Sequence, residues 1–270
     1  MSGGTSGGYG DQRQLGIYFS FSSVFSAGFS VFFKNLIPFL VMALVCYAPL
    51  LLYALIAPPP SIEGLPIEDA AWATLKTTAL VGLGSLICQQ LLVSTVTYAA
   101  VRELRGQHAS FKDSMAMGLS RLLPTIAVSI VAAIGQVLGL LALLIPGLIL
   151  MCMWYVAVPA SVVERPGILG ALGRSRELTR GYRWPIFGII IVVGLISGAA
   201  NGLLETVFVD TYEVADDLEL PTSWRTYMVY EVLSSLVFGA LGAAMAAAAY
   251  VGLRHSKDGI GADELARVFD

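Results

Sequence analysis

Two histidines are the first residues that could carry acid–base or metal chemistry in this chain of 270 residues. Neither His108 nor His255 has a second candidate ligand at helical spacing, whereas metal-assisted hydrolysis needs several preorganised oxygen or nitrogen ligands. The sequence contains no GxSxG, Walker or HExxH motif. We therefore expect no catalytic residue, no metal site, no cofactor and no enzymatic activity.

A run of arginines is the strongest candidate for a binding surface. The segment RPGILGALGRSRELTRGYRW contains five arginines and one acid. Guanidinium groups suit bidentate contact with phosphate, and an anionic lipid surface attracts each nearby arginine by about 1 kcal/mol. We assign lipid or partner binding to Arg174, Arg176, Arg180 and Arg183. The alternative is that these arginines only determine the topology of the chain.

Helical spacing refines this hypothesis. It predicts one face that carries Arg176, Arg180 and Arg183, with Leu169 and Leu172 close by. The leucines would face the acyl chains, while the guanidinium groups would lie among lipid phosphates.

Polar side chains inside apolar segments are the second candidate. Gln89 and Gln90 lie near the middle of one segment, and Gln136 lies near the middle of another. They could line a pathway for an ion or small solute; alternatively, they form interhelical hydrogen bonds of roughly 0.6–2 kcal/mol each. Further polar side chains lie toward segment ends, at Asn201, Glu205 and Glu231.

The elements that carry these residues are apolar helices. Hydrophobic residues make up 56% of the chain and charged residues only 13%, too few to coat a soluble domain of this length. Runs of about 20 apolar residues can cross a bilayer. Six such runs predict an all-α polytopic membrane protein: Leu36–Ile56, Thr78–Val101, Leu123–Leu144, Gly147–Val163, Pro185–Val207 and Tyr227–Leu253.

A pattern recurs before alternate spans. An amphipathic stretch, a basic residue and then a proline precede the first, third and fifth spans, with the prolines at Pro38, Pro124 and Pro185. In the first copy, one helical face carries Phe21, Phe25, Phe29 and Phe32, as in a helix at the membrane interface. We expect three repeats of interfacial helix plus helical hairpin, the middle hairpin turning at Ile145-Pro146-Gly147.

Glycine spacing predicts close helix packing. Gly194, Gly198 and Gly202 form a stripe of small residues, which lets helix backbones approach. We expect this stripe to pack inside one bundle; the alternative is a homo-oligomer interface.

The basic residues predict an orientation. Fourteen of the 16 Lys and Arg residues fall on one side of the proposed spans, so both termini should be cytoplasmic. We expect a flexible tail over residues 1–14, a single transmembrane domain over 15–253 and a cytoplasmic tail over 254–270. The net charge of -3 argues against nucleic-acid binding.

Residues 158–191 (VPASVVERPGILGALGRSRELTRGYRWPIFGIII) resemble the membrane domain of bacterial glycerophosphoryl diester phosphodiesterases. The IPG turn and the ending YVGLRHSKDGIGADELARVFD extend the resemblance over roughly Leu123 to Asp270. It implies a bacterial cytoplasmic (inner) membrane. In that family, hydrolysis belongs to a soluble barrel, which we expect this chain to lack.

Three functions follow as hypotheses. The leading one is a non-catalytic membrane protein that organises lipids, anionic ones above all, or partner proteins. The second is a transporter or channel for a small solute, which should have a polar cavity reaching the middle of the bundle. The third is an accessory membrane subunit of a lipid phosphodiesterase.

Overall fold

The computed structural model describes residues 19–56, 65–209 and 224–258, and none of these residues forms a strand. The elements are α1 (Phe21–Lys34), α2 (Leu36–Ile56), α3 (Ile67–Leu104), α4 (Phe111–Ala142), α5 (Leu144–Met153), α6 (Ala157–Glu164), α7 (Ile168–Thr179), α8 (Arg183–Val209), α9 (Trp224–Ser234), the π-helical segment η1 (Ser235–Gly239) and α10 (Ala240–Asp258).

Six helical stretches are long and apolar enough to cross a membrane. They are α2, α3, α4, α5 with α6, α8, and α9 with η1 and α10. Each contains most of one predicted apolar run, so the predicted all-α, six-span class is confirmed. The chain is a multi-pass membrane protein by this criterion.

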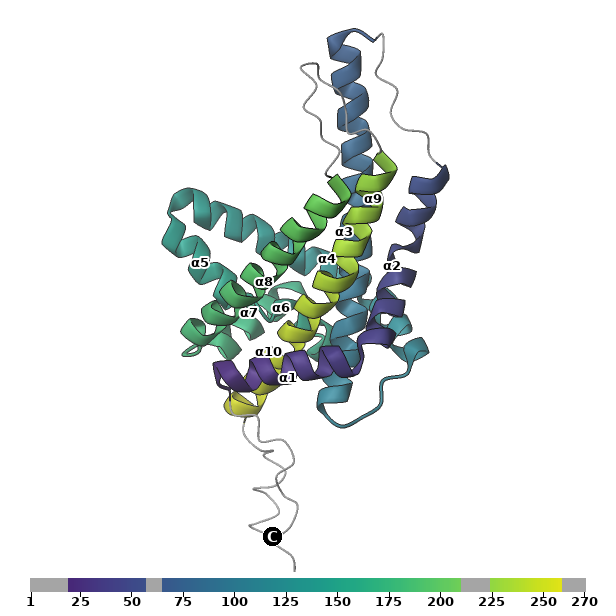
Figure 1. Ribbon diagram of the computed structural model, residues 1–270. Helices are drawn as coiled ribbons and strands as arrows, with labels where there is room; N and C mark the ends of the chain where they lie inside the picture. The colour runs from purple at the N-terminus through teal and green to yellow at the C-terminus, as the bar shows by residue number, and fades with distance from the viewer. Residues whose placement is uncertain (1–18, 57–64, 210–223, 259–270) are drawn as a thin grey trace, which may run out of the picture.

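The helices share two ends (Figure 1). At one end lie α1, the C-terminal ends of α3 and α10, and α7. We call this the basic end, because it carries Arg105, Lys112, Arg176, Arg180 and Lys257. At the opposite end lie the C-terminal ends of α2 and α8 and the N-terminal ends of α3 and α9. The first and the last described helices, α1 and α10, thus both reach the basic end, as an even number of spans requires.

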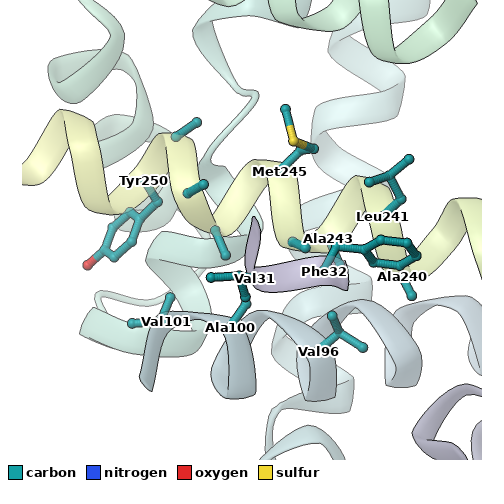
Figure 2. Packing of buried hydrophobic residues seen from close by; sticks show 14 of the residues in the cluster. Val31, Phe32, Val96, Ala100, Val101, Ala240, Leu241, Ala243, Met245 and Tyr250 are labelled. Carbon is teal, nitrogen blue, oxygen red and sulfur yellow. The ribbon is translucent and has the colours of Figure 1, made fainter. Parts of the chain in front are cut away.

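The core lies where α10 packs against both α1 and α3 (Figure 2). Ala240, Ala243, Val96 and Ala100 are at most 3% exposed, and Val31 of α1 closes the cluster from the third side. Alanine-rich faces allow helix backbones to approach closely, which compensates for the absence of a hydrophobic driving force in lipid. The alanine run of the last span is therefore a packing surface within the bundle.

The α4–α5 hairpin turns at Leu143, two residues before the predicted turn at Ile145-Pro146-Gly147. Leu143 has extended backbone (φ −166°, ψ 148°), and α5 begins at Leu144, so Pro146 lies in its first turn. Proline is tolerated there because its missing N–H would have no helical partner. A Cβ added at Gly139 would lie 3.1 Å from the Cα of Gly147, so the two glycines allow the arms of the hairpin to approach.

The span formed by α5 and α6 is broken near its middle. The amide of Ala157 donates to the carbonyl of Trp154 at 3.1 Å instead of to that of Met153. The freed Met153 carbonyl accepts hydrogen bonds from two hydroxyls of α7, Ser175 Oγ at 2.8 Å and Thr179 Oγ1 at 3.2 Å. The break therefore anchors α7 to the bundle, since a buried carbonyl needs a partner.

The three predicted repeats differ in structure. α1 and α7 are separate helices that precede spans whose first turns contain Pro38 and Pro185. In the second copy, Pro124 lies inside α4, so the amphipathic stretch and the span form one continuous helix. The prediction of a separate interfacial helix is thus wrong for this copy.

The aromatic face of α1 also differs in one member. Phe21, Phe25, Phe29 and Phe33 form a continuous ladder, with neighbouring ring centroids 4.5–5.9 Å apart. Phe32 instead points into the core and is 3% exposed, whereas Phe33 is 62% exposed. Packing against α10 decides which of these two adjacent rings is buried.

The last helix extends beyond residue 253, the predicted end of the transmembrane domain. α10 continues to Asp258, and Arg254 and Asp258 form an ion pair within it at 3.4 Å. Residues 254–258 are therefore helical, and the predicted division into domains stays a prediction. The predicted flexible segment 1–14 and residues 259–270 lie outside the described residues.

Candidate solute-binding cleft

An open cleft of about 500 Å³ lies between α2, α3, α8 and the α9–η1 segment. Its lining is Tyr47, Ser85, Leu86, Gln89, Ser197, Asn201, Glu231, Ser234, Ser235, Phe238 and Gly239. Most of these side chains are polar, although all lie on helices that are apolar enough to cross a membrane. Polar groups in such a position are costly unless they face partners or water.

Two helical irregularities border the cleft. Pro49 interrupts the hydrogen bonding of α2 two residues after Tyr47, and η1 is a π-helical turn. π-Helical turns occur frequently at functional sites, and broken helices form the binding sites of many transporters. The cleft thus lies where the regular helical backbone is interrupted on two of its walls.

The cleft ends inside the bundle. From Glu231 to Gly239 it extends over eight residues, roughly 12 Å along a helix. Beyond Gln89, toward the basic end, Leu92 and Val96 are fully buried, as is Met42 on α2 at 2% exposure. This apolar layer closes the cleft toward the basic end.

Three hydrogen bonds fix four of the lining side chains. Tyr47 Oη donates to Oε1 of Gln89 at 2.8 Å and joins α2 to α3. Asn201 Nδ2 donates to the carbonyl of Ser197 at 2.9 Å. Ser234 Oγ donates to the carbonyl of Glu231 at 3.2 Å. In each of these three bonds, the donor is a side chain of the lining.

Glu231 gives the cleft a negative charge. Its side chain is half-buried, and no described basic side chain forms an ion pair with it. Glu205 of α8 is exposed, and both carboxylates lie close enough to Tyr230 to act on its hydroxyl electrostatically. The described lining therefore attracts cations and repels anions.

The three predicted pathway glutamines have different environments. Gln89 lines the cleft, whereas Oε1 of Gln90 accepts a hydrogen bond from Ser129 of α4 at 3.0 Å. Consecutive residues of a helix point about 100° apart, so Gln89 and Gln90 face different neighbours. Gln136 is half-buried on α4 and is not part of the lining. Only Gln89 of the three belongs to this site.

At the basic end, Arg174 is the centre of an ion cluster. Its guanidinium contacts Glu164 at 2.8 Å, Glu177 at 3.2 Å and Asp258 at 2.6 Å, while Tyr250 Oη donates to Glu164 at 2.8 Å. Burial by itself would lower the pKa of Arg174, but its hydrogen bonds to Glu164 and Asp258 raise that pKa above its ordinary value. Arg174 thus links α6, α7 and α10 and is not placed to receive a lipid phosphate.

The other predicted arginines do not share a helical face. α7 ends at Thr179, Gly181 adopts φ +91°, and α8 begins at Arg183. Arg176 and Arg180 are exposed, and Arg183 is half-buried. The predicted single face is wrong because the left-handed turn at Gly181, which favours glycine, separates Arg183 from α7.

The leucines of α7 also differ in exposure. Leu172 and Leu178 are 7% and 0% exposed and pack inside the protein, against the predicted role of Leu172 at the lipid boundary. Leu169 is 76% exposed and Ile168 is 41% exposed. The apolar surface of α7 available to lipid is therefore its first turn.

The glycine stripe of α8 does not pack as expected. A Cβ added at Gly194, Gly198 or Gly202 would meet no described atom within 4 Å. The predicted packing of this stripe inside the bundle is therefore wrong, and the homo-oligomer interface stays a prediction.

Residues 68–253 match a family described as a domain of unknown function, DUF7847. The chain belongs to the DUF7847 family. The match spans more than half of the chain and includes every lining residue of the cleft except Tyr47. No curated protein and no solved structure matches the chain.

Part of the cleft within the DUF7847 region was not predicted from the sequence. Ser85, Ser197, Ser234 and Ser235 were not singled out, because isolated serines are common in transmembrane helices and usually bond to their own backbone. One signal was available: Ser197 and Asn201 are four residues apart, and such spacing places them on one helical face.

The DUF7847 region also brings together two arginines that sequence analysis did not pair. Arg165 ends α6 with a left-handed backbone (φ 59°) and extends to Met117 of α4, with Nη2 at 4.0 Å from Sδ. Arg121 lies one helical turn further along α4, and its buried Nε has no hydrogen-bond partner among the described residues. The two positive charges act on one another.

Proposed function

We propose that this protein binds a small polar solute in the cleft, as the binding step of transport across the membrane. The observation that carries the proposal is the polar cleft, which reaches Tyr47 near the middle of α2 and Gln89 on α3. A volume of about 500 Å³ lies in the range of small-molecule sites, which is about 300–1,000 Å³. The broken helices around it further support a transporter.

The orientation of the cleft is part of the proposal. Basic residues concentrate on the cytoplasmic side of membrane proteins, so the basic end with both termini is placed in the cytoplasm. The cleft then opens away from the cytoplasm, and the apolar layer at Leu92 and Val96 separates it from the cytoplasmic side. The membrane is proposed to be a bacterial cytoplasmic membrane.

The test is to identify small molecules that co-purify with the protein. Gln89→Leu combined with Asn201→Leu should abolish retention of the solute, because both changes remove polar groups of the lining. Gln136→Leu is the matched control, since it makes the same chemical change on α4 outside the lining. Retention that is equal in all three proteins would refute the proposal.

A second candidate function is organisation of anionic lipids or partner proteins at the basic end. It is supported by the exposed side chains of Arg176 and Arg180 and by the proximity of Arg121 and Arg165. Replacing Arg176, Arg180 and Arg183 by Gln should reduce the anionic lipid carried through purification, with a smaller difference at high salt. Equal anionic lipid in parent and variant, both correctly oriented, would argue against this function.

A third candidate is an accessory membrane subunit of a lipid phosphodiesterase, which rests on the resemblance of residues 123–270 to the glycerophosphoryl diester phosphodiesterase membrane domain. We propose that the chain itself is not an enzyme. The purified protein should not hydrolyse glycerophosphodiesters with any divalent metal; turnover that disappears when a single carboxylate is replaced would contradict this.

A further inference from the structure

We infer that the solute of the cleft is a small organic cation with N–H groups, bound with its ammonium group on the carboxylate of Glu231. The inference rests on the proposed function and adds the chemical class of the ligand. Four properties of the described lining support it: charge, hydrogen-bonding capacity, aromatic content and shape.

The first property is the charge. Glu231 is the only charged side chain of the described lining, and it is half-buried at the start of the last span. A carboxylate within a membrane-spanning segment is costly unless a cation or water compensates it. Attraction between opposite charges is stronger at the protein–lipid boundary than in bulk water, because the effective dielectric constant is lower. A bound ammonium group would supply the missing positive charge.

The second property is the hydrogen-bonding capacity of the lining. Tyr47 Oη and Asn201 Nδ2 both donate within the protein, to Gln89 and to the carbonyl of Ser197. The hydroxyl of Ser234 likewise donates to the carbonyl of Glu231. These bonds leave several acceptors, namely the Glu231 carboxylate, the Asn201 side-chain carbonyl and the hydroxyl lone pairs, beside the NH₂ donors of Gln89. A ligand that supplies N–H donors matches these acceptors.

The third and fourth properties are the aromatic content and the shape of the cleft walls. Phe238 is half-buried and adds an aromatic ring to the lining, and the faces of aromatic rings attract cations. Gly239 forms part of the wall beside Gln89; a Cβ there would lie 3.1 Å from Gln89 Oε1 and 3.1 Å from Leu92 Cδ2. The absence of a side chain at this position therefore leaves room beside the Gln89 amide.

The experiment is calorimetric titration of the full chain in lipid nanodiscs at constant ionic strength, with four probes. Putrescine carries two ammonium groups, 1,4-butanediol is its neutral analogue, succinate is an anion of similar length, and tetramethylammonium is a cation without N–H groups. We expect saturable binding of putrescine, weaker binding of tetramethylammonium, and no binding of the diol or of succinate at the same concentrations.

Variants assign the binding to Glu231. Glu231→Gln should weaken putrescine binding by about ten- to a hundredfold, as expected for loss of a hydrogen bond to a charged group. Glu231→Asp keeps the charge and should restore most of the affinity, which separates the loss from misfolding. Glu68→Gln is the matched control: it makes the same change in the exposed first turn of α3, outside the lining, and should bind like the parent.

Three results would overturn the inference: no putrescine binding by the parent, diol binding as tight as putrescine binding, or equal putrescine affinity in the parent and Glu231→Gln. The proposed function has a separate outcome. A neutral or anionic solute that co-purifies with the parent and is lost in the Gln89→Leu, Asn201→Leu variant would overturn the ligand class and keep the solute-binding function.

Discussion

The hydroxyl of Tyr47 on α2 donates a hydrogen bond of 2.8 Å to Oε1 of Gln89 on α3, within the wall of the cleft. Tyr47 is only 1% exposed, so the bond joins a buried ring to the side chain that faces the cleft. It orients the Gln89 amide, because the oxygen is held by Tyr47 and the NH₂ group is left for other partners.

Tyr47→Phe should therefore cost about 0.5–1.5 kcal/mol of stability, the usual net value of one hydrogen bond. Gln89→Leu removes the other partner, so the double variant should cost less than the sum of the two single changes. The measurement is a double-mutant cycle of unfolding in detergent micelles. Strictly additive costs would show that the bond does not stabilise the protein.

Arg174→Gln should destabilise the protein by about 1.5–3 kcal/mol, because it breaks charge-assisted hydrogen bonds to Glu164 and Asp258. The side chains of Arg174 and Glu164 are only 19% and 20% exposed, so solvent screens them less than a surface pair. Arg176→Gln is the control on the same helix, since Arg176 is exposed and should change stability by less than about 0.5 kcal/mol.

Thermal unfolding of the two variants in the same detergent micelles tests whether the ion cluster stabilises the fold. Equal melting temperatures for Arg174→Gln and Arg176→Gln would contradict the structural role of Arg174. Retention of anionic lipid should not fall in Arg174→Gln, because its guanidinium is already bound to carboxylates.

Two glycine-to-alanine substitutions should change the stability of the protein in opposite directions. A Cβ at Gly118 of α4 would meet the Thr95 hydroxyl and lie 3.2 Å from the backbone nitrogen of Thr95 on α3, so Gly118→Ala should cost about 1–3 kcal/mol. A Cβ at Gly173 of α7 would meet nothing within 4 Å, so Gly173→Ala should stabilise the protein by about 0.4–1 kcal/mol. Chemical denaturation in micelles measures both; destabilisation by both would contradict the open space at Gly173.

The topology is testable with reporters. A tag after Asp270 or near Gln107 should be protected from external protease, and a tag near Pro60 or Asp217 should be cleaved from outside, because the basic residues should remain cytoplasmic. Pro60, Asp217 and Asp270 lie outside the described residues. A cytoplasmic tag near Asp217 would contradict the six-span topology.

The spans were predictable because the length and hydropathy of a segment are local properties. The run Leu36–Ile56 was predicted with the bounds of α2, and the hairpin between α4 and α5 was predicted within two or three residues from Pro146 and Gly147. A segment of about 20 apolar residues has to form a helix in lipid, since its backbone groups must bond to one another. The all-α class therefore follows from the sequence alone.

The choice of neighbours was decided only by the tertiary structure. Gln89 and Gln90 are equivalent in sequence, yet one faces the cleft and the other bonds to Ser129 on α4. Arg174 was predicted as a lipid ligand, but the fold brings Asp258, 84 residues away in the chain, to its guanidinium. Which groups meet depends on how helices distant in sequence rotate and cross, because the alternative partners of a polar side chain differ little in energy and packing selects among them.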